Sequence, residues 1–155
     1  MPTPIDRPVR AALIAATGSW TETDVVLRYR PADPFAFRML FPPDVGLNER
    51  ATEWILSREL LAAGLNAPAG LGDVHIWPCG QHSTVVELSA AEGTARLAFV
   101  TEELRAFLRA SYVAVPWGGE SFHLDLDRAL DLLWRQAAPP PDRGSFGVSD
   151  GLYDA

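Results

Sequence analysis

The sequence has no lysine, only one cysteine and no long hydrophobic run. All 13 basic residues of the 155-residue chain are arginines, and 20 acidic residues bring the net charge to −7. Such a charge repels polyanions, which disfavours duplex DNA or an anionic membrane as a partner. The single cysteine, Cys79, cannot form an intramolecular disulfide, and no apolar stretch approaches the roughly 18–20 residues of a membrane span. We therefore expect a cytoplasmic protein without a membrane-spanning segment.

The remaining composition is typical of one globular domain. Hydrophobic residues make up 48% of the chain and charged residues 21%, both close to globular averages. Residues 1–8 contain three prolines, and from residue 139 onward proline, glycine, aspartate and serine dominate. We expect a flexible leader at 1–8, a single domain at 9–137 and a disordered tail at 138–155.

Alternating apolar residues predict strands. Val25, Leu27 and Tyr29 alternate with more polar positions, and after a proline-bounded turn the alternation continues from Phe35 to Phe41. Two such runs predict an antiparallel pair with one buried aromatic face. Further strands are expected from residue 9, at 51–56, at 73–77, at 83–88 and at 94–100, about seven in all.

Three helices are expected. Ser57 is a candidate N-cap for a short helix at 58–63, and Gly64 can end that helix in the left-handed conformation. Thr101 is the expected N-cap of a second helix, and Asp125 that of a third. The apolar positions of these last two helices are Leu104, Phe107, Leu108 and Tyr112, and then Leu126, Ala129, Leu130, Leu133 and Trp134. The fold class is α+β, with mostly antiparallel strands, one short internal helix and two C-terminal helices.

No set of residues predicts catalysis, a cofactor or a metal. His75, Cys79 and His82 are spaced suggestively, but a structural zinc site needs four convergent ligands, usually with paired thiolates. The sequence contains no nucleophile elbow and no complete phosphate-binding glycine motif. We therefore expect a protein that is not an enzyme.

Two features are candidates for binding a partner. Arg28, Arg30 and Arg38 fall on the strand face opposite the aromatic residues and would form a basic patch, partly neutralised by Glu22 and Asp24. A basic sheet of this kind can bind single-stranded nucleic acid, although a solvated face with ion pairs is the more common explanation.

The second candidate is Trp117. It lies between Pro116 and two glycines in an expected loop, where an exposed tryptophan can anchor an interface, although packing of the indole back over a helix end is the more common explanation.

The order of several segments resembles the SsgA-like family, the sporulation and cell-division regulators of actinobacteria. The resemblance covers roughly residues 10–135. Its segments are Val26-Leu27-Arg28-Tyr29, Asp33-Pro34-Phe35-Ala36, Trp54, Ser57-Arg58-Glu59-Leu60-Leu61-Ala62-Ala63-Gly64-Leu65, Pro68-Ala69-Gly70, Gly72-Asp73-Val74-His75-Ile76-Trp77-Pro78, Glu92-Gly93-Thr94-Ala95, Leu104, Phe107-Leu108, Val115-Pro116, Gly119-Glu120 and Phe122-His123-Leu124-Asp125-Leu126-Asp127.

The resemblance implies a fold of curved antiparallel sheets with helices, similar to the Whirly-type single-strand-binding proteins, and assembly as a homotrimer. It also implies a non-enzymatic regulator that is recruited to division septa and acts as an adaptor for FtsZ or for cell-wall remodelling proteins, with other SsgA-like proteins as further partners. The alternative is a single-stranded nucleic-acid-binding module on a Whirly-like sheet, which the acidic net charge disfavours.

Overall fold

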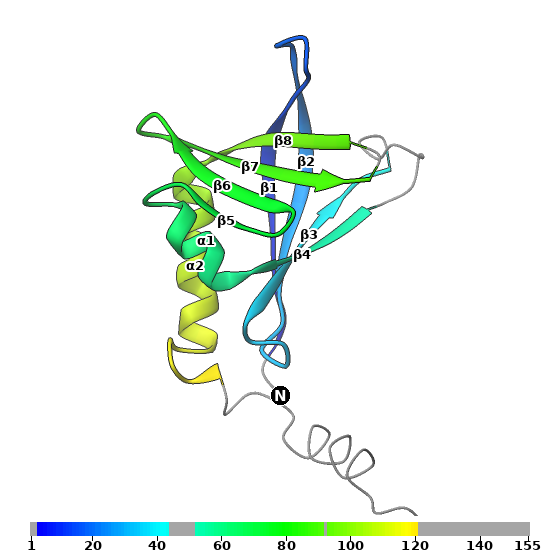
Figure 1. Cartoon of the computed structure of the whole chain (residues 1–155). Helices are drawn as coiled ribbons and strands as arrows, with labels where there is room; N and C mark the ends of the chain where they lie inside the picture. The colour runs from blue at the N-terminus through cyan, green and yellow to red at the C-terminus, as the bar shows by residue number, and fades with distance from the viewer. Residues whose placement is uncertain (1–2, 44–51, 92, 121–155) are drawn as a thin grey trace, which may run out of the picture. The chain divides into compact units, whose positions relative to one another are not determined.

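The computed structural model describes residues 3–43, 52–91 and 93–120, drawn in colour in Figure 1. Within them, eight antiparallel strands form one curled sheet and two helices pack against it. The elements in chain order are β1 (Ile5–Ile14), β2 (Trp20–Tyr29), β3 (Ala36–Phe41), β4 (Thr52–Ser57), α1 (Arg58–Gly64), β5 (Ala69–Leu71), β6 (Val74–Cys79), β7 (Ser83–Ala90), β8 (Gly93–Val100) and α2 (Thr101–Ala114).

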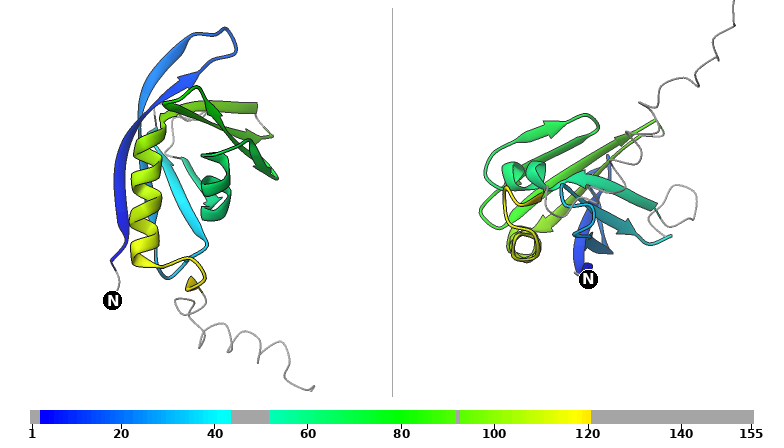
Figure 2. Two further views of the ribbon diagram at one scale, coloured as in Figure 1. Left: turned by 90° about the vertical axis from the view of Figure 1, so that its left-hand side faces the viewer. Right: turned by 90° about the horizontal axis from the view of Figure 1, so that it is seen from below.

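The sheet consists of two four-stranded meanders, each followed by a helix. The strand order is β4-β3-β2-β1-β8-β7-β6-β5. The two meanders therefore meet where β1 pairs with β8, in the register Ala11 opposite Phe99 to Ile14 opposite Arg96. Both helices lie on the concave side of the curled sheet (Figure 2). One face of every strand therefore contributes to a shared core.

The core confirms most of the expected alternation. Val25, Leu27 and Tyr29 are buried, and so are Phe37 and the other inward-facing positions of β3. The rings of Phe37 and Phe107 meet edge to face at 5.6 Å and join β3 to α2. Phe35 is the exception: its side chain is 54% exposed because it belongs to the turn before β3 begins.

The N-terminal boundary differs from the prediction. β1 begins at Ile5, and Asp6, Arg7 and Pro8 pair with Arg28, Leu27 and Val26 of β2. The expected leader at 1–8 is therefore wrong for residues 5–8. Pro8 suggested a break, but proline is tolerated in a strand where its missing N–H is not needed by a neighbour.

The short helix α1 begins as predicted and ends for a different reason. The Ser57 Oγ accepts a hydrogen bond from the Leu60 N–H at 3.1 Å, which confirms the N-cap. Gly64 is helical rather than left-handed, and the cap residue after it, Leu65, has a φ of −69°. A Cβ on Gly64 would lie 2.4 Å from the Cβ of Ile76. The glycine is needed because α1 approaches β6 closely. The helix ends within one residue of the predicted position, but the predicted left-handed conformation of Gly64 is wrong.

Helix α2 also begins differently from the prediction. Its N-cap is Val100, which makes no side-chain cap, and Thr101 is the first helical residue. The Oγ1 atoms of Thr101 and Thr84 are 2.8 Å apart and buried. Thr101 thus ties the start of α2 to β7 instead of capping the helix.

The expected number of strands, about seven, is one too low. The missing strand is β5, a three-residue edge strand where a turn was expected. The expected helix from Asp125 and the tail at 138–155 lie outside the described residues. No helix in the described ranges is long and apolar enough to cross a membrane.

Candidate interaction surfaces

Trp117 lies on a tight turn directly after α2 and is 66% exposed. Its ring meets that of Tyr112 edge to face at 6.4 Å. The turn is closed by a hydrogen bond from the Gly119 N–H to the Pro116 carbonyl at 2.9 Å, and Gly118 has a φ of +80°, which favours glycine. The exposed indole is therefore presented on an ordered turn.

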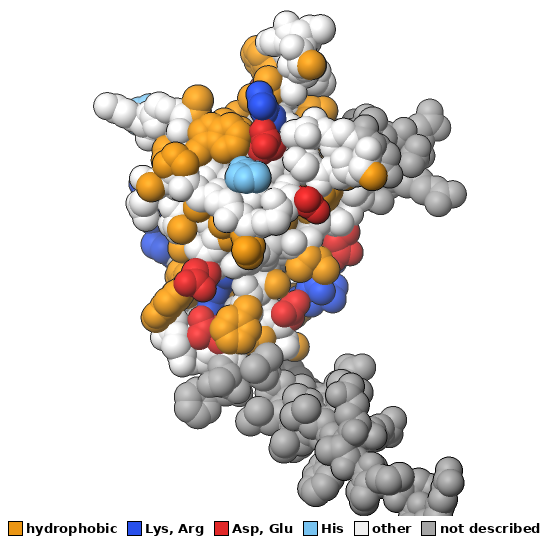
Figure 3. Space-filling view, in the orientation of Figure 1, with side chains coloured by type: hydrophobic (Ala, Val, Ile, Leu, Met, Phe, Trp, Pro, Cys, Tyr) orange, Lys and Arg blue, Asp and Glu red, His pale blue; other side chains and the backbone are white. Residues whose placement is uncertain are grey.

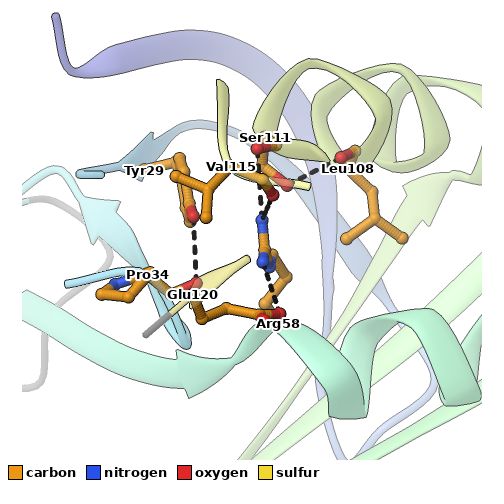
Figure 4. A network of polar contacts seen from close by, with 7 residues as sticks. All are labelled: Tyr29, Pro34, Arg58, Leu108, Ser111, Val115 and Glu120. Carbon is orange, nitrogen blue, oxygen red and sulfur yellow. Dashed lines mark hydrogen bonds and ion pairs between the residues drawn. The ribbon is translucent and has the colours of Figure 1, made fainter. Parts of the chain in front are cut away.

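A buried arginine contacts the chain before and after this turn (Figure 4). Arg58, the first residue of α1, is only 2% exposed. Its Nη1 donates hydrogen bonds to the carbonyls of Ser111 at 3.1 Å and Val115 at 2.8 Å, and its Nη2 donates to Glu120 Oε1 at 2.8 Å. One guanidinium therefore satisfies two carbonyls at the end of α2 and one carboxylate beyond the turn.

Two tyrosines complete the environment of Arg58. Its Cζ atom lies 4.3 Å from the ring centroid of Tyr112 and 5.1 Å from that of Tyr29, within the range of a cation–π interaction. Burial raises the pKa of Tyr29 to about 12, and its hydroxyl donates to the Pro34 carbonyl at 3.0 Å. Burial also raises the pKa of Tyr112. Both phenols are therefore neutral at neutral pH.

The carboxylate partner is held in its charged form. The pKa of Glu120 is lowered, mainly by its own backbone N–H; desolvation opposes this effect and the Arg58 guanidinium adds to it. The ionised side chain and the buried guanidinium thus form a charge-assisted pair. This pair fixes the chain where it leaves the Trp117 turn.

Sequence reasoning missed Arg58. An arginine at the start of a helix is normally assigned to solvent, and its partners Ser111, Val115 and Glu120 lie 53 to 62 residues away. One signal was available: the N-terminus of a helix favours anions, so a cation there is out of place unless something else binds it.

The predicted basic patch exists but is largely neutralised. Arg28 and Arg38 are cross-strand neighbours on β2 and β3. Arg28 donates two hydrogen bonds of 2.8 Å to Asp6, and the Arg38 Nε lies 2.6 Å from Glu53 Oε1. The hydrogen bond to Arg28 is the main cause of a lowered pKa of Asp6. Arg30 is exposed and forms no ion pair with the residues that the structure describes.

The carboxylates responsible differ from those expected. Glu22 and Asp24 pair with Arg10, at 3.0 and 3.6 Å, instead of with the predicted patch. The difference arises because β1 lies beside β2 along its whole length and places Arg10 opposite Asp24. With its two central arginines paired, this surface offers little free positive charge for a nucleic-acid strand.

His75 and Cys79 lie on β6, with Cys79 exposed at the end of the strand. His82 is exposed just before β7. Among residues 3–43, 52–91 and 93–120, no three histidine, cysteine or acidic side chains come together in a way that could hold a metal ion.

Comparison with known proteins identifies the family. The family model described as Streptomyces sporulation and cell division protein, SsgA, matches residues 23–120. The chain belongs to the SsgA family. It is 40% identical over 124 residues to the sporulation-specific cell division protein SsgB of Frankia casuarinae, covering 78% of this chain and 85% of the relative. It is 37% identical over 133 residues to SsgB of Streptomyces coelicolor, covering 84% of this chain and 95% of the relative.

A solved structure of the SsgA family has the same fold. The crystal structure of an SsgA-like sporulation-specific cell division protein from Thermobifida fusca YX-ER1 superposes with a TM-score of 0.73. The two sequences are 34% identical, over 84% of this chain and 96% of that one. These SsgA-family relatives support a role in cell division during sporulation, and the family is one of cell division regulators instead of a known enzyme family.

Proposed function

We propose that this SsgA-family protein is a non-enzymatic adaptor in sporulation-specific cell division. It binds FtsZ, or another protein of the septum or of cell-wall remodelling, through the surface around Trp117. The observation that carries the proposal is an exposed indole on an ordered turn. A buried arginine, Arg58, forms hydrogen bonds to the chain just before and just after this turn. Large aromatic side chains held in place before binding are typical centres of protein interfaces, because little side-chain entropy is lost on association.

The hydrogen bonds of Arg58 explain why Trp117 suits a binding surface better than the other exposed apolar side chains do. Arg58 donates hydrogen bonds to two carbonyls at the end of α2 and to the carboxylate of Glu120 after the turn. Trp117 is therefore bracketed by two fixed points of the backbone. We further propose that the protein works as a homotrimer, associates with other SsgA-like proteins, and is recruited from the cytoplasm to division septa.

The alternative, single-stranded nucleic-acid binding through Arg28, Arg30 and Arg38, has less support. Two of these three arginines are engaged by carboxylates, and the net charge of the chain is −7. Binding that depended on them would weaken steeply with salt, with a log–log slope of about −0.7 per phosphate contacted.

The test is co-sedimentation of the full-length protein with FtsZ polymers, with and without nucleotide. We expect saturable pelleting that requires polymer, and a loss of at least about fivefold in affinity for Trp117→Ala, as for residues at interface centres. Trp20→Ala is the matched control, because Trp20 is 64% exposed against 66% for Trp117 and lies at the tip of the β1–β2 hairpin.

Equal losses for the two variants would remove Trp117 as the binding centre. An absence of polymer-dependent pelleting would reject FtsZ as the direct partner and point to a wall-remodelling protein or another SsgA-like protein. Light scattering that finds a monomer at micromolar concentration would contradict the trimer.

A further inference from the structure

The outer face of β6, β7 and β8 carries an open hollow that the proposed adaptor surface does not use. The hollow has a volume of about 320 Å³ and is lined by Pro68, Ala69, Gly70, His75, Ile76, Trp77 and Glu87. Figure 3 shows hydrophobic, acidic, basic and histidine side chains gathered over these strands. The volume is at the lower end of the roughly 300–1,000 Å³ typical of small-ligand sites.

Cross-strand register builds the walls of this hollow. His75, Glu87 and Arg96 are successive partners across β6, β7 and β8. Trp77 lies two residues beyond His75 on the same face. Gly70 of the edge strand lies opposite His75, and a Cβ there would be 2.4 Å from the His75 Cδ2. The missing side chain at Gly70 therefore leaves room for the imidazole.

Only one of the two carboxylate oxygens of Glu87 accepts a hydrogen bond from the residues that the structure describes. Its Oε2 accepts a hydrogen bond from the Arg96 Nε at 2.7 Å. Its Oε1 lies 3.8 Å from the His75 Nδ1, beyond hydrogen-bonding distance. The Glu87 side chain is 18% exposed, whereas that of Arg96 is 58% exposed. One oxygen of this half-buried carboxylate thus forms no hydrogen bond with the residues that the structure describes. The carboxylate lines the hollow together with His75 and Trp77, and Arg96 beside it is the more exposed member of the ion pair.

We propose that this hollow binds an arginine side chain of a partner protein. The guanidinium would donate to Oε1 of Glu87 and lie against the indole of Trp77. Arginine suits such a site better than lysine does, because its planar fork pairs with carboxylates and also stacks on aromatic rings. The charge of the chain, −7, favours the approach of a basic segment.

The pair of Glu87 and Arg96 makes the proposal testable, because its two members should have opposite effects. Glu87→Gln removes the anion that receives the guest guanidinium. Arg96→Gln removes a competitor for the same carboxylate. If the two residues served only as a structural ion pair, both substitutions would change binding in the same direction.

The experiment is an NMR titration of the full-length ¹⁵N-labelled protein with N-acetyl-L-arginine methylamide. N-acetyl-L-citrulline methylamide is the control probe, since it has a similar shape but no charge. The indole N–H signal of Trp77 is identified by its loss in Trp77→Phe. We expect saturable shifts of this signal with a Kd of about 1–10 mM for the arginine probe, and at least about fivefold weaker binding of the citrulline probe.

In the variants, we expect Glu87→Gln to weaken arginine binding at least about fivefold and Arg96→Gln to strengthen it about two- to fivefold. Unchanged dispersion of the remaining amide signals shows that each variant is folded. Three results would overturn the proposal: equal shifts with both probes, no saturable shift up to about 50 mM arginine probe, or weakening by both substitutions. None of these three results depends on FtsZ binding, so the titration tests this proposal independently of the adaptor proposal.

Discussion

The two meanders of the sheet share one topology but present different outer faces. Across β1–β3, ion pairs link neighbouring strands, as between Arg10 and Glu22 or between Arg28 and Asp6. Across β6–β8 a row of apolar side chains, Trp77, Val85 and Ala98, runs at right angles to the strands. Val85 is only 4% exposed although it points away from the core.

The comparison shows that the two outer faces differ in how deeply their apolar side chains are buried. An antiparallel sheet that faces water usually carries polar residues on its outer face, and both meanders have cross-strand charge pairs there, Arg28 with Asp6 in the first and Arg96 with Glu87 in the second. The difference is one of burial, because Val85 of the second meander is nearly inaccessible to solvent whereas Val26 of the first is half-buried. The inner faces of both meanders are apolar because they share one core, whereas packing in that core does not constrain the residues on the outer faces.

The largest expected effect comes from breaking the contact between α1 and α2, the helices that follow the two meanders. Arg58→Met removes the guanidinium that ties α1 to α2 and leaves the Glu120 carboxylate and two carbonyls without their donor. We expect a loss of about 3–5 kcal/mol in the free energy of unfolding, measured by urea denaturation.

Arg109→Met is the control for this experiment, because it removes an arginine whose ion pair with Glu102 is exposed. We expect it to cost less than about 1 kcal/mol. Similar losses in the free energy of unfolding for Arg58→Met and Arg109→Met would show that the buried network does not stabilise the contact between α1 and α2.

A smaller loss of stability should distinguish the outer faces of the two meanders by the burial of their valines. Val85→Ala removes two buried methyl groups from the second meander, and we expect a loss of about 1–2 kcal/mol in the free energy of unfolding. Val26→Ala, on the outer face of the first meander, removes the same atoms from a half-buried position and should cost about half as much. Equal costs, again from urea denaturation, would mean that the two faces do not differ in burial.

The smallest effect concerns the ion pairs of the first meander and their response to pH. Arg28 lowers the pKa of Asp6 in the folded protein below its ordinary value of 3.8. The pair therefore stabilises the fold above about pH 3.8, and this contribution is lost as the pH falls through the lower folded value. Because Asp6 is 46% exposed, we expect Asp6→Asn to cost less than about 1 kcal/mol at pH 7.

In acid, the Asp6→Asn variant and the unchanged protein should become equally stable, which denaturation curves at several pH values would reveal. A difference that persisted unchanged below the folded pKa would indicate that Asp6 acts through packing instead of charge.

Much of the fold could be predicted from local pattern. The alternation of Val25, Leu27 and Tyr29 predicted the buried face of β2, and Ser57 predicted the start of α1, because both signals arise within a few residues. Gly64 and Thr101 were misjudged because the contacts that determine them, with Ile76 and Thr84, come from strands elsewhere in the chain. For the candidate sites, Trp117 could be proposed from its loop. The local sign of its anchor, Arg58, was a cation at the start of a helix, and that sign does not indicate partners 53 to 62 residues away.

The amino-acid sequence by itself thus determined the antiparallel α+β class, the inward faces of its strands and the family. Periodicity, caps and turn residues act over short distances and are visible in the order of the residues. Only the tertiary structure decided which arginine is buried, which carboxylates neutralise Arg28 and Arg38, and that His75, Trp77 and Glu87 share one hollow. These outcomes depend on strand register and on contacts such as that of Arg58 with Glu120, 62 residues apart, which no local pattern encodes.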